Sequence, residues 1–309
     1  MMKHTKKLLA LALAALLALS LAACREGSGQ NGSQSQGSAA SGEADWPVRV
    51  RDVDIPEAPQ RVLSLSPGTT EMLFDMGLGG RVAGVSDYCD YPAGEVQKRQ
   101  RCGTVLSINT SAVQRQDFDL VVASAPLAEQ DLIWFQQQDI PVLVLERAGS
   151  LEELRQNYLD LALALMGNLS GRNHGEGYWE ELEGMLQEGA GYSDGTHPRA
   201  ILLRQMGYGM ATGDTFEGSL LEELGFVNDA AAYTDWLYDR EDVADLEPDV
   251  IFADQSISID EIKSSAIYQP VAAVLNDKIM NVDLTVFERQ SPRMFQTLLE
   301  MAKFAYGVE

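Results

Sequence analysis

Two stretches far apart in the chain carry the same arrangement of residues. The first, "SAVQRQDFDLVVA", begins at Ser111, and the second, "EDVADLEPDVIFA", begins at Glu241. They have the same length, with Val at the third position, Asp at the ninth, and then an apolar run that ends in Ala. A repeat of a whole segment indicates that the two halves of a chain are built alike. The repeat therefore predicts two similar lobes.

Short apolar runs alternate with helical segments in both halves. The runs predict buried strands, and they are "RVLSLS", "RVAGVS", "DLVVAS", "PVLVLE", "RAILLRQ", "PDVIFAD" and "KIMNVD". Between them, "TTEMLFDMGLGG", "EQDLIWFQQQ" and "SLLEELG" predict helices. Alternating strands and helices predict an α/β fold with parallel sheets. Such sheets bind ligands at the carboxyl ends of their strands.

A long helical region separates the two halves. Ser150 and Glu153 have the spacing of a helix-capping box, and apolar residues follow at helical intervals. A second amphipathic helix is expected over about residues 174 to 189, ahead of a glycine-rich stretch. The predicted organisation is an N-terminal lobe over residues 46–170, an interlobe helix over 171–193 and a C-terminal lobe over 194–309.

The N-terminal segment predicts export from the cytoplasm. Lys3, Lys6 and Lys7 precede an unbroken run of Leu, Ala and Ser over residues 8–23. This run is shorter than the roughly 20 residues that span a membrane. Residues 1–23 are therefore predicted to be a secretory signal peptide. The following "LAAC", ending at Cys24, resembles the lipobox of bacterial lipoproteins.

The lipobox resemblance implies that Cys24 is lipidated and becomes the first residue of the mature chain. The alternative is an uncleaved anchor with an incidental cysteine. After Cys24, the rest of residues 24–45 is rich in Gly, Ser, Gln and Ala without apolar periodicity, which predicts a flexible tether. The expected location is extracytoplasmic, with the folded part anchored to the cell membrane through lipidated Cys24.

Charge and cysteine content narrow the possible partners. The formal net charge is −23, so nucleic-acid phosphates and anionic lipid head groups would repel the chain. Cys89 and Cys102 could form one disulfide in an extracytoplasmic setting, or remain two buried thiols. Beyond the signal peptide, His174 and His197 lie in no zinc-like pattern, so no metal site is expected.

Three segments resemble a known family. "RVLSLSPGTTEMLFDMGLGGRVAGVSDYCDYP", "PDVIF" and "FERQSPR" are similar to the helical-backbone (class III) substrate-binding proteins of ABC transporters, and most similar to cobalamin-binding proteins. The resemblance runs from about Pro56 to the C-terminus. It implies two Rossmann-like α/β lobes joined by a single long interlobe helix, with a ligand cleft between them. It also implies a monomer that catalyses nothing, has no cofactor, and delivers its ligand to a permease with its ATPase.

The same resemblance implies a docking arrangement. Members of the class dock onto the permease through one surface glutamate on each lobe. Glu241 occupies the C-lobe position, eight residues before Asp249. The equivalent N-lobe position, eight residues before Asp119, is Ser111, which departs from the pattern.

Several aromatic and flexible residues are candidates for ligand contact. Tyr88 occupies the position of a ring-contacting tyrosine in cobalamin binders, and Tyr91 lies just beyond it. In the second half, Trp236 lies near the place of a cleft tryptophan in the family. Tyr208 and Met210 lie on the glycine-flexed loop "MGYGMATG". For all of these, the alternative is an ordinary loop or core residue.

The segment "TVFERQSPR" is the strongest candidate in the second half. Arg289 matches a family arginine that reaches ligand, and Phe287 and Arg293 flank it. For Arg293, a structural salt bridge is an equal alternative. Cobalamin binders typically have Asp-Trp where this chain has Thr285-Val286, so Thr285 replaces an acceptor there. This departure leaves a related corrinoid as an alternative to cobalamin.

Other function classes fit the sequence less well. A siderophore binder usually brings several cations into its cleft, and here the candidates are few, chiefly Arg289, Arg293 and Arg204. A haem binder needs an axial His, Met or Tyr, which Met210, Tyr88 or Tyr208 could supply. The sequence contains no nucleophile elbow, P-loop or dinucleotide fingerprint. The predicted function is therefore capture of cobalamin or a related corrinoid, with a ferric siderophore or haem as the alternative.

Overall fold

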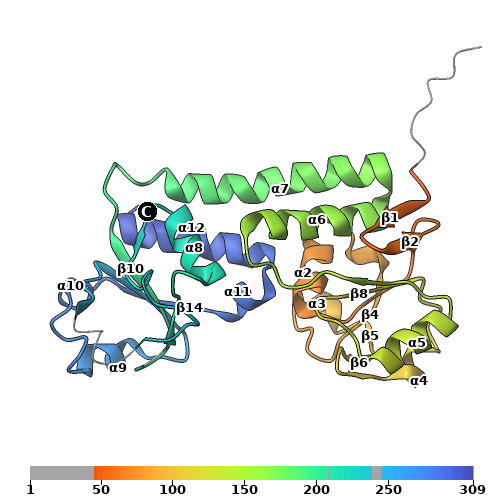
Figure 1. The fold of residues 1–309 in the computed structure, drawn as a ribbon, viewed down its shortest axis with the longest axis horizontal. Helices are drawn as coiled ribbons and strands as arrows, with labels where there is room; N and C mark the ends of the chain where they lie inside the picture. Colours follow the sequence, from red (N-terminus) through yellow and green to blue (C-terminus); the bar gives the residue numbers. More distant parts are fainter. Residues whose placement is uncertain (1–44, 208, 239–244, 309) are drawn as a thin grey trace, which may run out of the picture. The chain divides into compact units, whose positions relative to one another are not determined.

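The computed structural model describes residues 45–207, 209–238 and 245–308, and these contain two five-stranded sheets, one parallel and one mainly parallel (Figure 1). The predicted signal peptide, Cys24 and nearly all of the predicted tether lie outside the described residues. Residues Glu43–Glu309 form one compact unit. No helix in the described part of the chain is both long and apolar enough to cross a membrane.

The first sheet belongs to the N-terminal lobe, and all of its strand pairs are parallel. Its order is β5-β4-β3-β8-β9. The strands are β5 (Gln100–Arg101), β4 (Val82–Val85), β3 (Val62–Ser64), β8 (Leu120–Ala123) and β9 (Val142–Val144). β8 is apolar and buried along its whole length, as expected of a strand covered on both faces. The four strands predicted here are confirmed, and β5 adds a short edge strand.

The second sheet belongs to the C-terminal lobe. Its order is β11-β10-β13-β14, and β12 also pairs with β10. The strands are β10 (Arg199–Gln205), β11 (Gly209–Met210), β12 (Val227–Asn228), β13 (Val250–Asp254) and β14 (Ile279–Val282). The β10-β13 and β13-β14 pairs are parallel, whereas β11 runs antiparallel to β10. The three strands predicted in this half are confirmed.

Two small hairpins complete the strands. They are β1 (Val48–Val50) with β2 (Val53–Ile55), and β6 (Gly103–Thr104) with β7 (Ser107–Ile108). In the first hairpin, the Arg51 side chain donates hydrogen bonds to Asp160 Oδ2 at 2.8 Å and to Asn157 Oδ1 at 2.6 Å. These bonds fix the start of the fold onto the helix that carries both acceptors.

Helices cover both sheets. The N-terminal lobe has α2 (Pro67–Asp75), the 3-10 turn η1 (Gly79–Arg81), α3 (Ala93–Val96), α4 (Thr110–Val113) and α5 (Glu129–Gln137). The connecting region has α6 (Leu151–Met166) and α7 (Asn168–Ala190). The C-terminal lobe has α8 (Phe216–Glu223), α9 (Ile259–Ser264), α10 (Ala272–Leu275), α11 (Thr285–Arg289) and α12 (Pro292–Tyr306).

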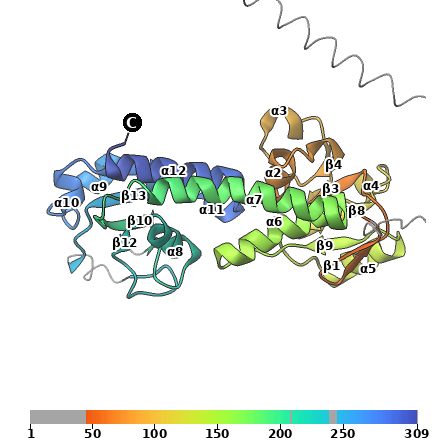
Figure 2. The same ribbon diagram turned by 90° about the horizontal axis from the view of Figure 1, so that it is seen from above.

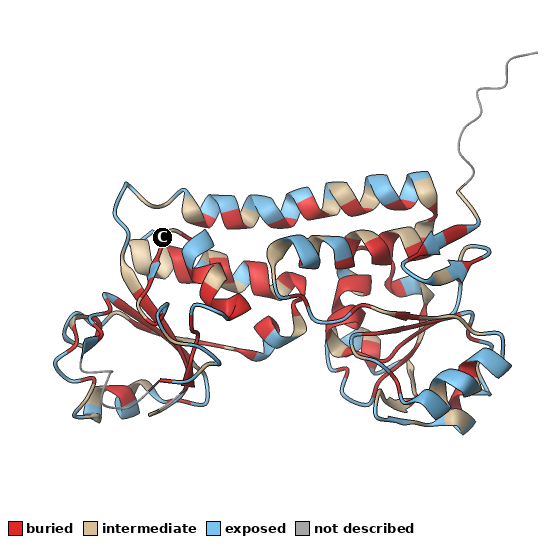
Figure 3. Cartoon of the chain, viewed as in Figure 1, coloured by how far each residue is buried: buried red, intermediate tan, exposed pale blue. Residues whose placement is uncertain are grey.

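Helix α7 packs on α6 in one lobe and on α12 in the other (Figures 1 and 2). An aromatic chain follows the same path, because Trp179 lies 5.8 Å from Tyr158 of α6 and 5.7 Å from Phe295 of α12, centroid to centroid. The side of α7 that faces the lobes is buried and its outer side is exposed (Figure 3). The interlobe helix therefore belongs to a hydrophobic core that spans both lobes.

The interlobe helix begins earlier than the sequence pattern predicted. The Asp45 carboxylate accepts hydrogen bonds from the backbone N–H groups of Leu169 and Ser170, at 2.9 and 3.2 Å. These bonds satisfy donors that have no partner within the helix, and they lower the pKa of Asp45. Asp45 precedes Leu169 by 124 residues in the sequence, so local periodicity could not reveal this cap.

Candidate ligand-binding site

A cavity of about 420 Å³ lies between the two lobes. Its N-lobe wall comes from the start of α2 and from the segments that follow β8 and β9, while α11 forms the facing wall. The cavity thus opens at the carboxyl ends of parallel strands, where α/β sheets bind ligands. Thr285 and Arg289 of the predicted ligand-binding residues line it.

The start of α2 sets the shape of the N-lobe wall. Ser66, at the end of the β3 segment, accepts hydrogen bonds through Oγ from Ser124 N and Ser124 Oγ at 2.7 and 2.8 Å. Pro67 then begins the helix, which suits a position whose N–H would be unpaired within it. At Gly68, an added Cβ would lie 2.1 Å from the backbone oxygen of Arg289. Glycine there allows α2 to contact α11 directly.

The facing wall is fixed by Gln290, the residue after α11. Gln290 adopts a left-handed backbone conformation (φ 51°) that ends the helix. Its side-chain amide donates to Ala148 O at 2.7 Å and accepts from Ala148 N at 2.8 Å. Tyr158 also donates its hydroxyl hydrogen to the backbone oxygen of Gln290. Because Ala148 and Tyr158 belong to the N-terminal side, these bonds tie the lobes together beside the cavity.

Arg289 lies at the centre of an ion network that joins the lobes. Nη1 of Arg289 lies 2.7 Å from Glu71 Oε1 and 2.6 Å from Asp90 Oδ1. Nη2 of the same side chain lies 2.9 Å from Asp90 Oδ2. Arg293 reaches Glu71 from the next helix at 2.7 and 2.9 Å. The hydrogen bonds from Arg289 hold the pKa of Asp90 below its usual range, against the opposing effect of partial burial. The structural salt bridge considered for Arg293 is thus present.

Two further arginines near the cleft are also paired with carboxylates. Arg147, which lines the cavity, pairs with buried Glu217 of α8. Arg204 pairs with Glu288 at 2.7 Å and lies over the Trp236 ring, 5.2 Å from its centroid. The predicted cleft tryptophan is therefore half-buried beneath an arginine.

Two predicted tyrosines, Tyr88 and Tyr91, do not line the cavity. The Tyr88 side chain is exposed, with a relative exposure of 71%, on the loop after β4. Tyr91 is partly exposed and stacks against Arg293, whose guanidinium carbon lies 4.4 Å from the ring centroid. The loop from 88 to 91 is therefore attached to the C-terminal lobe by both Arg293 and Arg289.

Two predicted ligand contacts are core residues. Met210 lies in β11 with no exposed surface and packs in the core of the C-terminal lobe. Phe287 is almost fully buried in the core cluster that spans the lobes. Neither lines the cavity, and for Met210 this agrees with the alternative of a core residue. Contact of either residue with ligand stays a prediction. Apolar residues beside a binding motif cannot be distinguished from core residues by sequence alone.

Other predictions fall outside the described residues or on a plain surface. Tyr208 and Glu241 are not among the described residues, so their roles in ligand binding and permease docking stay predictions. Ser111 is exposed on α4 in the N-terminal lobe. A serine there cannot supply the carboxylate expected for docking on this side.

The two cysteines are free in the structure. Cys89 Sγ lies 3.2 Å from Thr70 Oγ1, and Cys102 Sγ donates weakly to Gln100 O. The two side chains pack in different hydrophobic clusters. Of the two possibilities predicted from the sequence, the structure therefore has two buried thiols and no disulfide between them.

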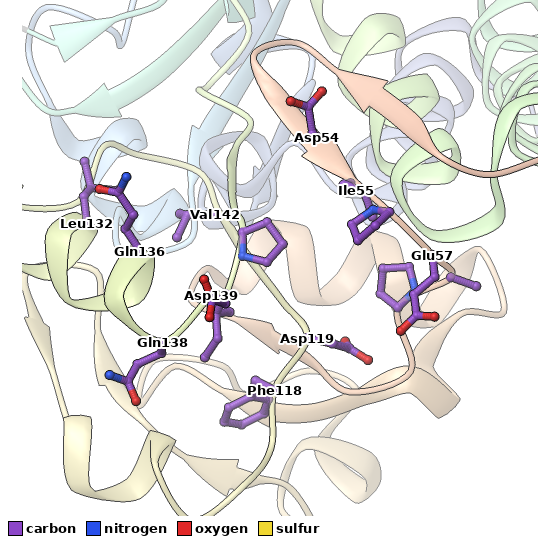
Figure 4. Close-up of a pocket in the computed structure, with 15 residues that line it drawn as sticks. Asp54, Ile55, Glu57, Phe118, Asp119, Leu132, Gln136, Gln138, Asp139 and Val142 are labelled. Atoms are coloured by element: carbon purple, nitrogen blue, oxygen red, sulfur yellow. The ribbon is translucent and has the colours of Figure 1, made fainter.

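A second cavity, of about 590 Å³, lies elsewhere (Figure 4). It is lined by Ile55, Phe118 and Asp119, and by residues 138–142, at the end of the N-lobe sheet where β8 and β9 begin. Parallel sheets bind ligands at the opposite edge. No group of three or more potential ligating His, Cys, Asp or Glu side chains occurs within the described ranges. The interlobe cavity is therefore the better candidate.

Sequence reasoning missed part of the cavity wall. Gly68, Ser124, Arg147 and Gln290 of the wall were not predicted, nor was Ser66, which bonds to Ser124 behind it. Ser66 and Ser124 directly follow predicted strands, so the carboxyl-end rule could have identified them. Gln290 gave no such signal, because its partner is 142 residues away.

Comparisons with known proteins agree with this architecture. Residues 62–284 match a family described as periplasmic binding protein. The chain is 26% identical over 307 residues to YvrC of Bacillus subtilis (strain 168), named an ABC transporter substrate-binding lipoprotein, covering 94% of each chain. It is 24% identical to a vitamin B12-binding protein of Vibrio parahaemolyticus (serotype O3:K6, strain RIMD 2210633), covering 82% of this chain and 92% of that one.

A solved structure shares the fold. A possible iron-binding (periplasmic solute-binding) protein from Staphylococcus epidermidis ATCC 12228 superposes with a TM-score of 0.67 at 20% identity. The match covers 81% of this chain and 100% of that one. At this identity the likeness concerns the fold of the two lobes.

Proposed function

The chain belongs to the periplasmic binding protein family, and we propose that it is the substrate-binding lipoprotein of an ABC importer for cobalamin or a related corrinoid. It captures its ligand between the lobes and delivers it to the permease. Binding, rather than catalysis, is its task. The observation that carries this proposal is the interlobe cavity, which lies at the strand ends and includes Arg289 and Thr285.

The chemistry of the cleft suits an amide-bearing macrocycle. A corrinoid offers a flat apolar ring and many uncharged amide groups. The cavity wall combines apolar contacts from Met72 and Leu145 with polar groups from Thr69, Ser124 and Gln290. Ligand sites of this kind are mostly apolar with a few oriented polar groups.

The cavity is smaller than a complete corrinoid, so the ring would extend beyond it to the rim. Tyr88 lies two residues before Asp90, which bonds to Arg289 of the cavity wall, and most of its side chain is exposed. A tyrosine there offers a rigid apolar face and a polar tip to a bound ring. The gain on binding is burial of that exposed surface.

The bonds between the lobes favour binding without large domain closure. Gln290 and the network around Arg289 join the lobes beside the cavity, and α7 adds a continuous core above them. A wide opening would break several buried polar contacts at once. Lobes that rotate by tens of degrees on ligand binding would contradict this part of the proposal.

Membrane attachment and permease docking complete the proposal. Lipidation of Cys24 would hold the chain at the outer face of the cell membrane, and Glu241 would dock the C-terminal lobe to the permease. YvrC, which aligns over nearly the whole chain, is named a lipoprotein of this type. Loss of membrane fractionation in Cys24→Ala, with retention in the unchanged chain, tests the anchor.

A haem or ferric siderophore is the second candidate ligand. The exposed phenol of Tyr88 is the observation that favours it, because a tyrosine can coordinate haem iron. Met210 cannot serve as the axial ligand considered from the sequence while it remains fully buried.

Titration calorimetry tests the proposal with cyanocobalamin, cobinamide, a ferric siderophore and haemin as separate ligands. We expect one-to-one binding of at least one corrinoid, weakened by Tyr88→Ala. Because Tyr88 is largely exposed, this substitution should leave folding intact. Leu106→Ala is the matched control, since Leu106 is another exposed apolar residue, in the turn of the β6-β7 hairpin. Binding of an iron chelate or haemin alone would replace the corrinoid as ligand.

A further inference from the structure

The cationic groups of the cleft are all engaged. Among the described residues that line the cavity, Arg147 and Arg289 are the cationic ones. Arg147 pairs with Glu217, and Arg289 pairs with Glu71 and Asp90. No lining cation is therefore left over, within the described ranges, to receive an anionic group of a ligand.

These pairs resist exchange with a ligand. The side chains of Glu71 and Glu217 are only 2% and 3% exposed. If a ligand carboxylate took Arg147 away, buried Glu217 would lose this partner. If it took Arg289 away, buried Glu71 would keep one of its two arginines, Arg293. Leaving one member of a buried pair uncompensated is strongly unfavourable. An anionic ligand would thus have to displace carboxylates that the fold already holds in place.

The charge around the cleft is negative as a whole. The arginines at the cleft are Arg147, Arg204, Arg289 and Arg293, whereas the carboxylates beside them are Glu71, Asp90, Glu146, Glu217 and Glu288. A cleft with an excess of one sign repels ligands of that sign. An anionic chelate would enter against this field.

The remaining donors suit uncharged acceptors. Gly68 and Thr69 at the start of α2 line the cavity, and the first N–H groups of a helix have no acceptor within it. A carbonyl oxygen of an amide can accept from such a group without bringing a net charge into the cleft.

We propose that the cleft selects a ring-shaped ligand with uncharged polar groups over the same ring bearing carboxylates, and that Asp90 is a residue that determines this specificity. The inference rests on the proposed function in taking the interlobe cavity as the ligand site. Asp90 forms two parallel bonds with Arg289 while its own side chain is 65% exposed. Of the carboxylates on Arg289, it is the one that a substitution can remove without leaving a buried site empty.

The test uses two matched pairs of probes. The first pair is dicyanocobinamide and dicyanocobyrinic acid, in which carboxyl groups stand in place of the amides. The second pair is haemin dimethyl ester and haemin, which differ in two carboxylates. Affinities are measured by fluorescence quenching or calorimetry with the compact unit Glu43–Glu309, at low and high salt.

Asp90→Asn tests the role of the residue, and Asp87→Asn is its matched control. Asp87 is exposed on the same loop, so its substitution makes the same charge change at a distance from Arg289. We expect the unchanged protein to prefer the uncharged member of at least one pair by about tenfold or more, the scale of one charge-assisted contact. Asp90→Asn should shrink that ratio about tenfold by strengthening the carboxylate member, most clearly at low salt. Asp87→Asn should leave the ratio unchanged.

The outcomes separate this inference from the corrinoid proposal. If the protein prefers haemin dimethyl ester to haemin and binds neither corrinoid, the result would support the inference and overturn the proposal that the ligand is a corrinoid. Equal or tighter binding of the carboxylate members would overturn the inference, as would a failure of both uncharged rings to bind. If Asp90→Asn leaves the ratio of the two affinities unchanged, or if Asp90→Asn and Asp87→Asn change it alike, Asp90 does not determine the specificity. A merely structural effect of Asp90 would weaken both members of a pair together.

Discussion

The side-chain amide of Gln290 pairs with the backbone of Ala148, donating to its oxygen at 2.7 Å and accepting from its nitrogen at 2.8 Å. Both groups are buried, and the two residues belong to different lobes. The side-chain amide thus forms the same pair of hydrogen bonds with Ala148 that the backbone of an adjacent strand would form. These bonds hold the end of α11 beside the cavity. The link between the lobes is therefore direct at this point, and does not depend on α7 alone.

Removal of this amide should destabilise the protein. Gln290→Gly keeps the left-handed backbone accessible while it deletes the two bonds, and Gln290→Ala also strains the backbone. Because a buried N–H and a buried C=O lose their partners, we expect each variant to lose about 2 kcal/mol or more in free energy of unfolding. Urea denaturation measures this loss. Gln296→Ala, at an exposed position of α12, is the control, and a loss of equal size there would contradict the argument.

Glu71 is expected to be the most sensitive member of the ion network. It is buried between Arg289 and Arg293, and Glu71→Gln would remove the charge that both guanidinium groups face. Breaking a buried pair from one side costs about 3–5 kcal/mol. Denaturant titration should show a loss near this range, whereas Glu300→Gln on the exposed side of α12 should have little effect. Stability unchanged in Glu71→Gln would show that the network does not hold the lobes.

The sequence was sufficient for the repeating part of the fold. Apolar runs identified the seven main strands. Capping residues identified the start of a helix at Ser150, whose Oγ accepts a hydrogen bond from Glu153 N. The start of α7 was misplaced because its cap, Asp45, is more than a hundred residues away in sequence. Local periodicity reports only which face of an element is buried.

The candidate site was predictable only in part. Arg289 and Thr285 line the cavity as expected from the family motif, although their contact with ligand stays a prediction. The partners of Arg289 could not be inferred, because Glu71 is 218 residues away and reads as one polar position within an amphipathic helix. Met210 and Phe287 are buried in the core, which the motif could not reveal because it does not show which way an apolar side chain points.

Acid should weaken the contact between Asp90 and Arg289. The pKa of Asp90 is lowered in the folded state, chiefly by its hydrogen bonds from Arg289, so the contact stabilises the protein above the unfolded pKa near 3.8. That contribution is lost as pH falls through the lowered pKa of the folded state. We expect Asp90→Asn to be less stable than the unchanged protein at pH 7, by a small amount because the Asp90 side chain is largely exposed. The difference between the denaturation midpoints should be the same at pH 7 and 5 and smaller at pH 3, and a constant difference would exclude this cause.

The two thiols should be unreactive while the protein is folded. Burial raises the pKa of Cys102 to about 11 and also raises the pKa of Cys89, and the reactive form of cysteine is the thiolate. At pH 8 we expect almost no alkylation of Glu43–Glu309 by iodoacetamide in buffer, and two added groups in denaturant without reductant. Intact mass spectrometry distinguishes these species. Alkylation in denaturant that requires a reductant would show that the cysteines are bonded.

The close approach of α2 to α11 at Gly68 should be intolerant of even one methyl group. In Gly68→Ala the new Cβ would lie 2.1 Å from the backbone oxygen of Arg289, so one helix must move away from the other. Overpacking of this kind costs about 1–3 kcal/mol. It should also lower ligand affinity, because Gly68 and Arg289 both line the cavity. Gly94→Ala in α3 is the matched control, since no atom lies within 4 Å of the added Cβ. Urea denaturation and calorimetry on both variants measure the two effects, and equal behaviour of the two alanines would show that the contact between α2 and α11 does not shape the site.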